Sequence, residues 1–429
     1  MSSVRGMAQA ARDAGRVLAT TPHALRQDAL TAIADALQRE EAALEEANQK
    51  DLTAAQAGSL APPILKRLYF GAEKRAEAIS GVRTVAALPD PLGAVLEARV
   101  LDDRLNLERI STPIGVICMI FESRPDALVQ IAALAIKSGN GVILKGGSEA
   151  RHSNRALADL IHRVTCATGL PEGWLQLLET REDVGELLGL HDLVDLVIPR
   201  GSNEFVQYIM KNTTIPVMGH ADGICHLYID RDADVTMAVD VVVDAKTQYV
   251  AVCNATETIL IHEAIAPQVL PKLAAQLHAR GVEIRGCPRT QEIIPSVHPA
   301  GEVDWSTEYL DYIVAIRVVR DIASAIDHIN HYGSGHTDAI ITDSRDEAES
   351  FIQRVDSSSV ICNASTRFAD GFRYGLGAEV GISTSRIHAR GPVGVTGLMS
   401  YKWVLRGDGH IVEDYATGKR RFAHQDPLS

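Results

Sequence analysis

The stretch GVICMIFESRPDALVQIAALAIKSGNGVILKG, residues 115–146, decides the fold class. It opens with a continuously apolar run, residues 116–121, and closes with a second one, residues 141–145. The segment between them begins at Pro125 and ends at Gly139, and these residues are typical of the first turn and the end of a helix. Apolar strands separated by a helix indicate a parallel sheet that is covered on both faces and built from right-handed crossovers.

The same alternation extends along most of the chain and predicts two consecutive α/β series. Further strands are expected at residues 174–179, 193–199, 256–262, 282–287, 311–319 and 358–363, with helices between them. Residues 1–55 are expected to be helical, and residues 90–115 to form a hairpin that turns at Asp102-Asp103. A second hairpin is expected around the Gly-Asp-Gly turn of residues 397–415. In such sheets, ligands bind at the carboxyl ends of the strands.

Composition excludes several classes of function. The 429 residues are 46% hydrophobic and 23% charged, which is typical of a globular protein with two or three domains. A formal charge of −13 argues against a nucleic-acid or anionic-membrane surface but leaves room for a local basic pocket. No apolar run approaches the roughly 20 residues of a membrane span, and no secretory signal is visible, so we expect a cytoplasmic protein.

The cysteines predict free thiols and no metal site, because they are widely spread and have neither CxxC pairs nor zinc spacing. Cys253 stands apart, since it lies among small residues in YVAVCNATETILIH, residues 249–262, just before a predicted strand. Such a loop offers space and backbone N–H groups for an oxyanion, which a nucleophilic cysteine requires. An inert packed cysteine is the other interpretation, and the local sequence does not separate the two.

Several long motifs occur in the order seen in one enzyme family. Besides the cysteine loop they include IFESRPDALVQIAALAIKSGNGVILKGGSEARHSN (120–154), HINHYGSGHTDAIITD (328–343) and NASTRFADGFRYGLGAEVGIST (363–384). Through these motifs the chain resembles the γ-glutamyl phosphate reductases, a branch of the aldehyde dehydrogenase superfamily, over residues 10–415. The resemblance implies an α/β fold of the aldehyde-dehydrogenase type, with a Rossmann-type cofactor domain, an α/β catalytic domain and an oligomerisation hairpin.

The resemblance also divides the chain. It implies an NADP-binding domain in residues 1–93 and 113–221 and a catalytic domain in residues 222–390. Residues 94–112 and 391–429 would supply oligomerisation strands and the C-terminal segment, so we expect a homo-oligomer, either a dimer or a tetramer. No kinase-like segment precedes the match, and a single activity is therefore expected.

In that family, NADPH reduces γ-glutamyl phosphate to glutamate 5-semialdehyde and phosphate, the second step of proline synthesis from glutamate. The resemblance implies that the Cys253 thiolate attacks the acyl phosphate, expels phosphate and forms a thioester that is then reduced. This suits a thiolate, which is both a strong nucleophile and a good leaving group. The alternatives are another acylating or a hydrolytic semialdehyde dehydrogenase, and a non-catalytic oligomeric partner of glutamate kinase.

Cofactor-binding candidates follow two predicted strands. Lys145 ends one of them and precedes Gly147 and Ser148, where backbone can approach a ligand and the lysine can bond ribose hydroxyls or a 2′-phosphate. A plain surface lysine is the alternative. Glu149 could instead accept from a 2′-hydroxyl, which is a feature of NAD sites, so the preference for NADP comes from the family alone.

Three further cofactor candidates have equally plain alternatives. Gly201 and Ser202 lie between a strand and a helix, where N–H groups can meet a pyrophosphate, although Ser202 would also serve as a helix cap. Glu308 resembles the glutamate of the superfamily's ExF motif, which holds the nicotinamide ribose; the alternative is a solvated loop acid.

Substrate-binding candidates are cations and one amide. Arg124, Arg367 and Arg386 could bind the carboxylate or phosphate through paired N–H groups, or could form structural ion pairs. Asn254 could support the oxyanion. The chain departs from hydrolytic aldehyde dehydrogenases at two motifs, because MGHADGICH (218–226) lacks the glutamate of ELGGK and ESRPD (122–126) lacks the asparagine of WNFP. Loss of the base that activates water suits a thioester that exchanges with phosphate.

Overall fold

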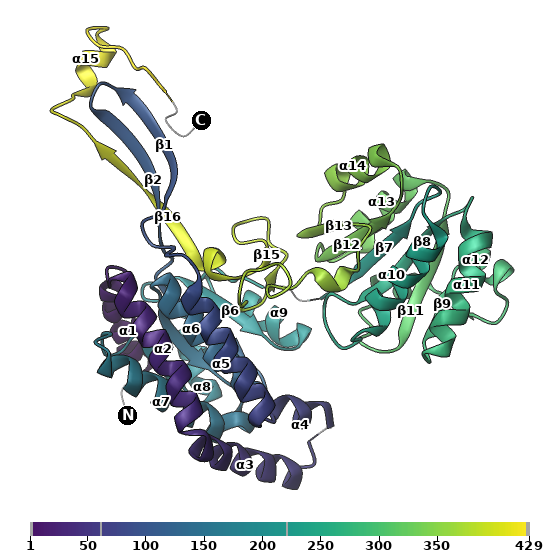
Figure 1. Cartoon of the computed structure of the whole chain (residues 1–429), viewed down its shortest axis with the longest axis horizontal. Coiled ribbons are helices and arrows are strands. Elements are labelled where there is room, and N and C mark those ends of the chain that lie inside the picture. Colours follow the sequence, from purple (N-terminus) through teal and green to yellow (C-terminus); the bar gives the residue numbers. More distant parts are fainter. Residues whose placement is uncertain (1–2, 61, 220–221, 426–429) are drawn as a thin grey trace.

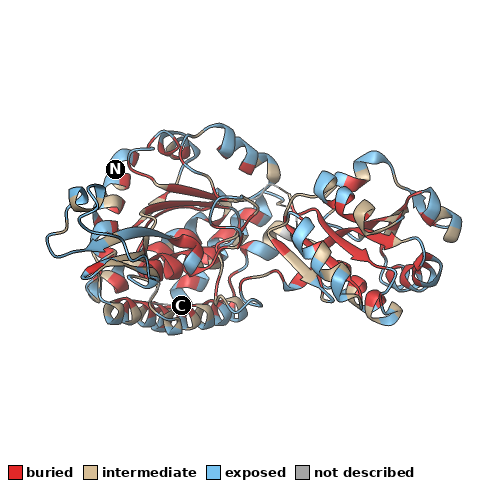
Figure 2. Ribbon diagram, turned by 90° about the horizontal axis from the view of Figure 1, so that it is seen from above, coloured by how far each residue is buried: buried red, intermediate tan, exposed pale blue. Residues whose placement is uncertain are grey.

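The computed structural model describes residues 3–60, 62–219 and 222–425, which form two α/β units and a projecting arm (Figure 1). The first unit contains a four-stranded sheet and the second a seven-stranded sheet. Strands are buried in both units, whereas the outward faces of the surrounding helices are exposed (Figure 2). No helix in the described part of the chain is long and apolar enough to cross a membrane.

The first sheet is parallel, with the strand order β5–β4–β3–β6. Its strands are β3 (Val116–Phe121), β4 (Gly141–Lys145), β5 (Leu175–Leu178) and β6 (Leu196–Arg200). The helices of this unit are α1 (Val4–Leu18), α2 (His23–Arg39), α3 (Glu41–Ala57), α4 (Pro62–Leu68), α5 (Ala72–Ala87), α6 (Pro125–Ser138), α7 (Arg151–Ala167), α8 (Arg181–Leu187) and α9 (Asn203–Lys211), with a short 3-10 turn η1 (Ser148–Ala150). The helix predicted between Pro125 and Gly139 is confirmed, and Gly139 ends it in the left-handed conformation, with φ of 74°.

Strand β3 explains why an apolar run forms the centre of this unit. Its alternate residues face opposite sides, as in any strand. Ile117 and Met119 pack in the core formed with α2, α5, α6 and α7, and Val116 and Cys118 pack in the core formed with α1, α8 and α9. Both faces of the sheet are therefore covered, and Cys118 is a packing residue.

The second sheet is also parallel, with the order β10–β9–β11–β8–β7–β12–β13. Its strands are β7 (Cys225–Ile229), β8 (Thr256–His262), β9 (Glu283–Gly286), β10 (His298–Pro299), β11 (Ile313–Val319), β12 (Thr337–Ile341) and β13 (Ser359–Cys362). Helices α10 (Val235–Thr247) and α11 (Ala266–Ala279) cover one face, and α13 (Ile322–Tyr332) and α14 (Arg345–Arg354) cover the other. The unit also contains α12 (Pro288–Ile293), η2 (Glu302–Ser306) and η3 (Thr366–Phe368).

The arm is a three-stranded antiparallel sheet that extends away from both units (Figure 1). The predicted hairpin around residues 90–115 is confirmed as β1 (Val95–Asp102) and β2 (Leu105–Pro113). The predicted C-terminal hairpin is wrong, because β16 (Met399–Arg406) pairs with β2, and the chain after the Gly-Asp-Gly turn forms the short helix α15 (Val412–Ala416). The alternating pattern of residues 399–406 therefore reflects pairing with a strand almost 300 positions earlier in the chain.

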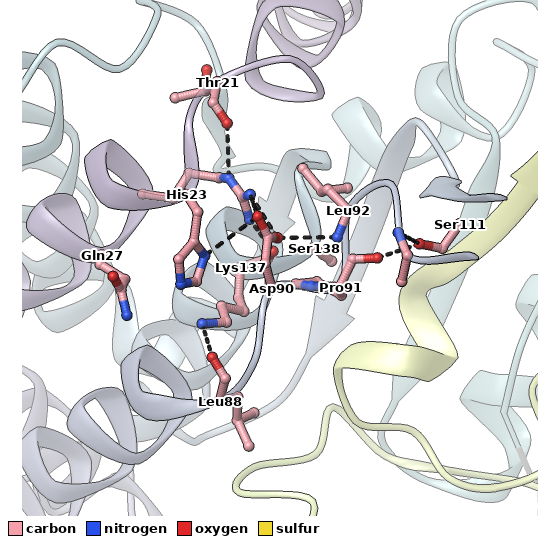
Figure 3. Close-up of polar contacts among 12 residues, drawn as sticks. Thr21, His23, Gln27, Leu88, Asp90, Pro91, Leu92, Ser111, Lys137 and Ser138 are labelled. Carbon is pink, nitrogen blue, oxygen red and sulfur yellow. Dashed lines mark hydrogen bonds and ion pairs between the residues drawn. The ribbon is translucent and has the colours of Figure 1, made fainter. Parts of the chain in front are cut away.

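A buried polar network fixes the segment that leads into the arm (Figure 3). Arg26 of α2 donates to both Asp90 oxygens, at 2.7 and 2.8 Å, and to the backbone oxygen of Lys137 at 2.7 Å. Asp90 also accepts from Leu92 N–H at 3.0 Å, and Ser111 at the base of β2 donates to the carbonyl of Pro91. The start of the arm is thus tied to the helices of the first unit.

The chain returns from the second unit to the first before it enters β16. Ala378, Val380 and Val393 on this returning segment pack into the core of the first unit. The segment contains the two-residue strands β14 (Ile382–Ser383) and β15 (Gly391–Pro392) and the turn η4 (Val395–Leu398). It therefore connects the two units a second time and carries motif residues to the region between them.

Candidate active site

Cys253 lies on the loop that precedes β8, at the amino edge of the second sheet. The first residue of β7, Cys225, and the preceding Gly223 contact the backbone of this loop. The Cys225 thiol, at the start of β7, donates to the carbonyl oxygen of Cys253 at 3.1 Å. Gly223 packs so closely that a methyl group there would lie 2.1 Å from the same oxygen. Only a glycine therefore fits at position 223 without displacing the cysteine loop.

The surroundings of Cys253 keep its thiol protonated in the free protein. Burial, together with the carboxylates of Glu308 and Glu379, raises the pKa of the thiol to about 12, although Arg200 opposes them. A thiolate therefore requires either additional positive charge or the neutralisation of a carboxylate. Burial raises the pKa of Glu379 to about 7, with Arg200 acting in the opposite direction, so this carboxyl can exchange a proton near neutral pH.

Glu308 is held close to the cysteine loop by its own loop. Burial raises the pKa of Glu308, and a hydrogen bond from the Gly223 N–H opposes this. Two residues later, Leu310 N–H donates to Glu257 of β8 at 3.3 Å. Glu257 in turn forms an ion pair of 2.5 Å with Lys246 at the end of α10, and both side chains are fully buried. This pair joins the helix, the strand and the loop that surround the nucleophile.

Cations from both units surround Cys253. Arg200 ends β6 of the first sheet and interacts electrostatically with Glu379 and Cys253. Arg367 of η3 is 8% exposed, donates from Nε to Gln248 at 3.0 Å and also interacts with Cys253. Arg124, which precedes α6, is exposed but interacts electrostatically with Arg200 and Glu379. Of the predicted candidates, Arg367 thus interacts with the nucleophile itself, and Arg124 interacts with Arg200 and Glu379, which in turn interact with Cys253.

Two other predicted substrate residues are placed differently. Asn254 is buried, and its amide nitrogen donates to the carbonyl of Ala369 at 2.9 Å, while its backbone oxygen accepts from Thr366 at 2.7 Å. These contacts tie the cysteine loop to η3. Arg386 is 80% exposed and pairs with Asp356, so the structure does not bring it into the cluster around Cys253.

The first sheet carries a cleft at the carboxyl ends of its strands. Its volume is about 1260 Å³, and its lining includes Lys145, Gly147, Ser148 and the aromatic side chains of Phe205 and Tyr208. Lys145 is 7% exposed and donates to the carbonyl of Gly146 at 2.6 Å. Burial lowers the pKa of this lysine, with Glu149 opposing. Ligand clefts commonly measure ~300–1000 Å³, so this cleft is large enough for a dinucleotide.

Gly201 and Ser202 lie between β6 and α9. A side chain at Gly201 would lie 2.9 Å from the carboxyl carbon of Glu122, which lines the cleft, so the glycine allows Glu122 to pack against this turn. Ser202 caps α9 through a hydrogen bond from Phe205 N–H at 3.4 Å, as the alternative interpretation expected. Glu149, the residue that favoured NAD, accepts from both the backbone and the hydroxyl of Ser123 through Oε1, at 2.8 and 2.5 Å.

Among the described residues, the histidines of the quoted motifs belong to no group that could hold a metal ion. His226 bonds to Asp338 at 3.0 Å in the core of the second unit, and His220 lies outside the described residues. Within the described ranges, no three histidine, cysteine, aspartate or glutamate side chains are grouped so that they could hold a metal ion.

Sequence reasoning missed several residues of this site. Arg200, Glu379, Gly223 and the Lys246–Glu257 pair gave no local signal, because each depends on contacts with another part of the chain. Arg200 and Glu379 are 179 positions apart in the sequence. Glu379, Gly223 and Glu257 nevertheless fall within the quoted motifs.

Comparisons with known proteins agree with this arrangement. The model of the aldehyde dehydrogenase family matches residues 2–300. The chain is 56% identical to gamma-glutamyl phosphate reductase from Acetivibrio thermocellus, covering 98% of each chain. It is 53% identical to the protein of the same name from Natronomonas pharaonis, covering 97% of this chain and 96% of the relative.

Solved structures show the same fold. The crystal structure of gamma-glutamyl phosphate reductase from Thermotoga maritima superposes with a TM-score of 0.93 at 40% identity, over 96% of this chain and 100% of that one. An acetylating aldehyde dehydrogenase from Geobacillus thermoglucosidasius gives a TM-score of 0.65 at 19% identity, over 95% of this chain and 97% of that one, and shows the fold alone. The predicted fold class is confirmed, and an aldehyde dehydrogenase fold implies a nicotinamide cofactor. The chain belongs to the γ-glutamyl phosphate reductase family within the aldehyde dehydrogenase superfamily.

Proposed function

We propose that this protein reduces L-glutamyl 5-phosphate to L-glutamate 5-semialdehyde and phosphate, with NADPH as reductant and Cys253 as nucleophile. The observation that supports this most is the electrostatic interaction of Cys253 with two arginines, Arg200 from the first unit and Arg367 from the second. An acyl phosphate carries negative charge next to the carbonyl that the sulfur must attack. Two cations at that point both favour the thiolate and bind the phosphate.

The backbone of the cysteine loop is arranged to stabilise the oxyanion. The Cys225 thiol holds the carbonyl of Cys253 toward the protein interior. A trans peptide directs its N–H opposite to its C=O, so the N–H of Asn254 points away from Cys225. We assign the oxyanion to this N–H rather than to the Asn254 side chain, which donates to Ala369.

The reaction then needs little beyond positioning. The Cys253 sulfur bonds to the acyl carbon, the C–O bond to phosphate breaks, and Arg200, Arg367 and Arg124 stabilise the departing phosphate. The cofactor supplies hydride when it is bound. Cys253 leaves as thiolate when the reduced adduct collapses to the aldehyde, and Glu379, with a pKa of about 7, is the group that can give and take a proton nearby.

NADP is the proposed cofactor, and Lys145 the residue that binds its adenosine end. Arg181 lies across the same cleft and interacts electrostatically with Lys145, so two cations are available for a 2′-phosphate. The carboxylate that would favour a free 2′-hydroxyl, Glu149, is occupied by Ser123. Gly147, Ser148, Gly201 and Ser202 would meet the phosphates, and Glu308 the nicotinamide ribose.

Assembly and location complete the proposal. The outer edge of β16 carries exposed Tyr401, Trp403 and Leu405, which suits strand pairing in a dimer or tetramer. The cytoplasm is the proposed location, and contact with a glutamate kinase is a further proposal that follows from the shared unstable acyl phosphate.

The reverse reaction gives the sharpest test of the function. Glutamate 5-semialdehyde is oxidised with NADP in the presence and absence of phosphate, with arsenate as a second acceptor, and reduction of NADP is followed by absorbance. We expect turnover only when phosphate or arsenate is present, since the thioester needs an oxyanion acceptor. Full turnover without either would identify a hydrolytic dehydrogenase and contradict the proposal. Cys253→Ala serves as control and should abolish turnover while NADPH binding is retained.

A further inference from the structure

A polar hollow of about 410 Å³ lies at the amino edge of the second sheet. Its lining includes residues 333–335 before β12, residues 356–357 before β13, and Thr384, Arg386 and Arg390 on the returning segment. Apart from Ile329, the lining residues carry a charge, an amide or a hydroxyl group, or are glycines. A ligand of this hollow would therefore be small and rich in polar groups.

The charges in the hollow match a zwitterion. Asp356 accepts from Arg386 and, at 2.8 Å, from Arg390, which also donates to the Asp356 backbone oxygen at 3.2 Å. Two cations against one anion leave a net positive charge that favours a carboxylate. Within the described residues, Nε and Nη1 of Arg386 make no hydrogen bond, so a pair of donors is available. The oxygens of Asp356 can accept from an ammonium group.

Strand spacing places the loop of the nucleophile and a loop of the hollow about 10 Å apart, which is near the reach of a five-carbon substrate. Strands β8 and β12 flank β7, so the loops that precede them, which carry Cys253 and Gly335, are two strand spacings apart at the same edge. Two spacings amount to about 10 Å. A glutamyl group spans about 5 Å from its acyl carbon to its α-carboxylate carbon, and one hydrogen bond adds about 3 Å.

Direct contacts connect the two places. Gly223 packs on the backbone of Cys253, and the next residue, Ile224, donates from its N–H to the Ser334 hydroxyl at 2.9 Å. Ser334 is part of the wall of the hollow. The cysteine loop and the hollow therefore share one continuous set of packed residues, and their separation is fixed.

We propose that this hollow binds the α-carboxylate and α-ammonium groups of the glutamyl substrate while its acyl carbon is bound to Cys253. Arg386 binds the carboxylate, and Asp356, oriented by Arg390, accepts from the ammonium group. The inference rests on the proposed function and adds the subsite that selects an α-amino acid. A free phosphate dianion suits the hollow less well, because it would meet the Asp356 carboxylate.

The test compares two aldehydes that differ in the α-amino acid head. Wild-type protein and Arg386→Gln are assayed with NADP and arsenate on glutamate 5-semialdehyde and on pentanal. Loss of a charged hydrogen bond predicts that kcat/KM of the variant falls about 10- to 100-fold more for the semialdehyde than for pentanal. Equal losses with both aldehydes, or no loss with the semialdehyde, would overturn the proposal.

The control variant is Arg320→Gln. Arg320 is 76% exposed and pairs with Asp321, much like Arg386 with Asp356, but it follows β11 at the opposite edge of the same sheet. Arg320→Gln should leave the ratio of kcat/KM for glutamate 5-semialdehyde to kcat/KM for pentanal unchanged. A shift of that ratio as large as in Arg386→Gln would mean that any loss of surface charge produces the effect, and the proposal would fail.

A binding measurement separates failure of the subsite from failure of the proposed reaction. L-Glutamate and pentanoate are added to wild-type protein and to Arg386→Gln, and Tm is measured for each. We expect L-glutamate to raise the Tm of the wild type more than that of the variant, and pentanoate to have the same small effect on both. If the assay shows no phosphate-dependent oxidation but this difference appears, the reaction is wrong and the subsite stands. An equal response to L-glutamate overturns the subsite.

Discussion

Removing one partner of the buried Lys246–Glu257 pair should strongly destabilise the unit that carries the nucleophile. Both side chains are 0% exposed, and their charged atoms are 2.5 Å apart. Lys246→Met leaves a carboxylate in the core, and Glu257→Gln leaves an ammonium group there. Breaking a buried pair in this way costs about 3–5 kcal/mol, a large part of the ~5–15 kcal/mol that stabilise a typical protein.

The two variants should respond to pH in opposite directions. Burial already raises the pKa of Glu257 to about 7, and loss of Lys246 raises it further. A raised pKa means that the stability of Lys246→Met is present at low pH and is lost as pH rises through the folded-state pKa. Burial lowers the pKa of Lys246, so Glu257→Gln should instead lose stability as pH falls. Lys246→Met is therefore worse at pH 9 than at pH 6, and Glu257→Gln is worse at pH 6.

Urea unfolding at both pH values, with hydrogen exchange of the β8 segment as a local readout, measures these effects. The control is Glu292→Gln, which breaks an ion pair with Arg289 of the same 2.5 Å separation but with both side chains more than half exposed. That change should cost less than about 1 kcal/mol. If Lys246→Met or Glu257→Gln costs no more than the control, or if both variants share the same pH trend, the reasoning about buried charge is refuted.

Three further results are expected. Alkylation of Cys253 by iodoacetamide, followed by peptide mass spectrometry, should accelerate continuously from pH 7 to pH 10, because its pKa is about 12; a plateau below pH 9 would contradict this. Lys145→Met should weaken NADPH binding about 10- to 100-fold in a fluorescence titration, with the alkylation rate of Cys253 unchanged; an unaltered affinity would remove Lys145 from the cofactor site. Gly223→Ala should lower kcat on the order of 100-fold, because the new methyl group would lie 2.1 Å from the Cys253 oxygen, whereas Gly219→Ala, with a nearest contact of 3.6 Å, should not; equal effects would show that the cysteine loop tolerates displacement.

Much of the fold follows from local pattern, because many elements carry their own signals. The strand at residues 256–262 is found at the predicted positions, since its apolar residues are continuous and buried on both faces. Strands β7 and β12 were missed as strands. They begin with buried polar residues, and these are satisfied only across the sheet, as in the bond from His226 N–H to Asp338 at 2.7 Å. A pattern of single-residue hydrophobicity contains no information about such a partner.

The sequence allowed the nucleophile of the site to be predicted, but not every charged residue that the fold brings next to it. Its small neighbours and its place before a strand made Cys253 a candidate, and the resemblance of the surrounding motifs to one enzyme family favoured the nucleophile over a packed cysteine. Arg200 and Glu379, by contrast, acquire their significance only because the fold brings β6 and the returning segment together. Arg386 illustrates the reverse case. It was chosen for its charge and lies outside the cluster around the sulfur, in the separate hollow with Asp356.

The two sheets use opposite strand edges, and this difference has a physical reason. Cofactor binding needs exposed backbone N–H groups and space, which the carboxyl ends of the first sheet provide around Lys145 and Gly201. A nucleophile needs a rigid backbone, because a misplacement of about 1 Å can cost roughly 100-fold in rate. At the amino edge of the second sheet, Cys225 holds the carbonyl of Cys253, and Thr366 holds that of Asn254. The rule that ligands bind at the carboxyl ends of strands therefore locates the cofactor cleft in the first sheet. The position of the nucleophile, Cys253, is instead set by buried contacts at the amino edge of the second sheet.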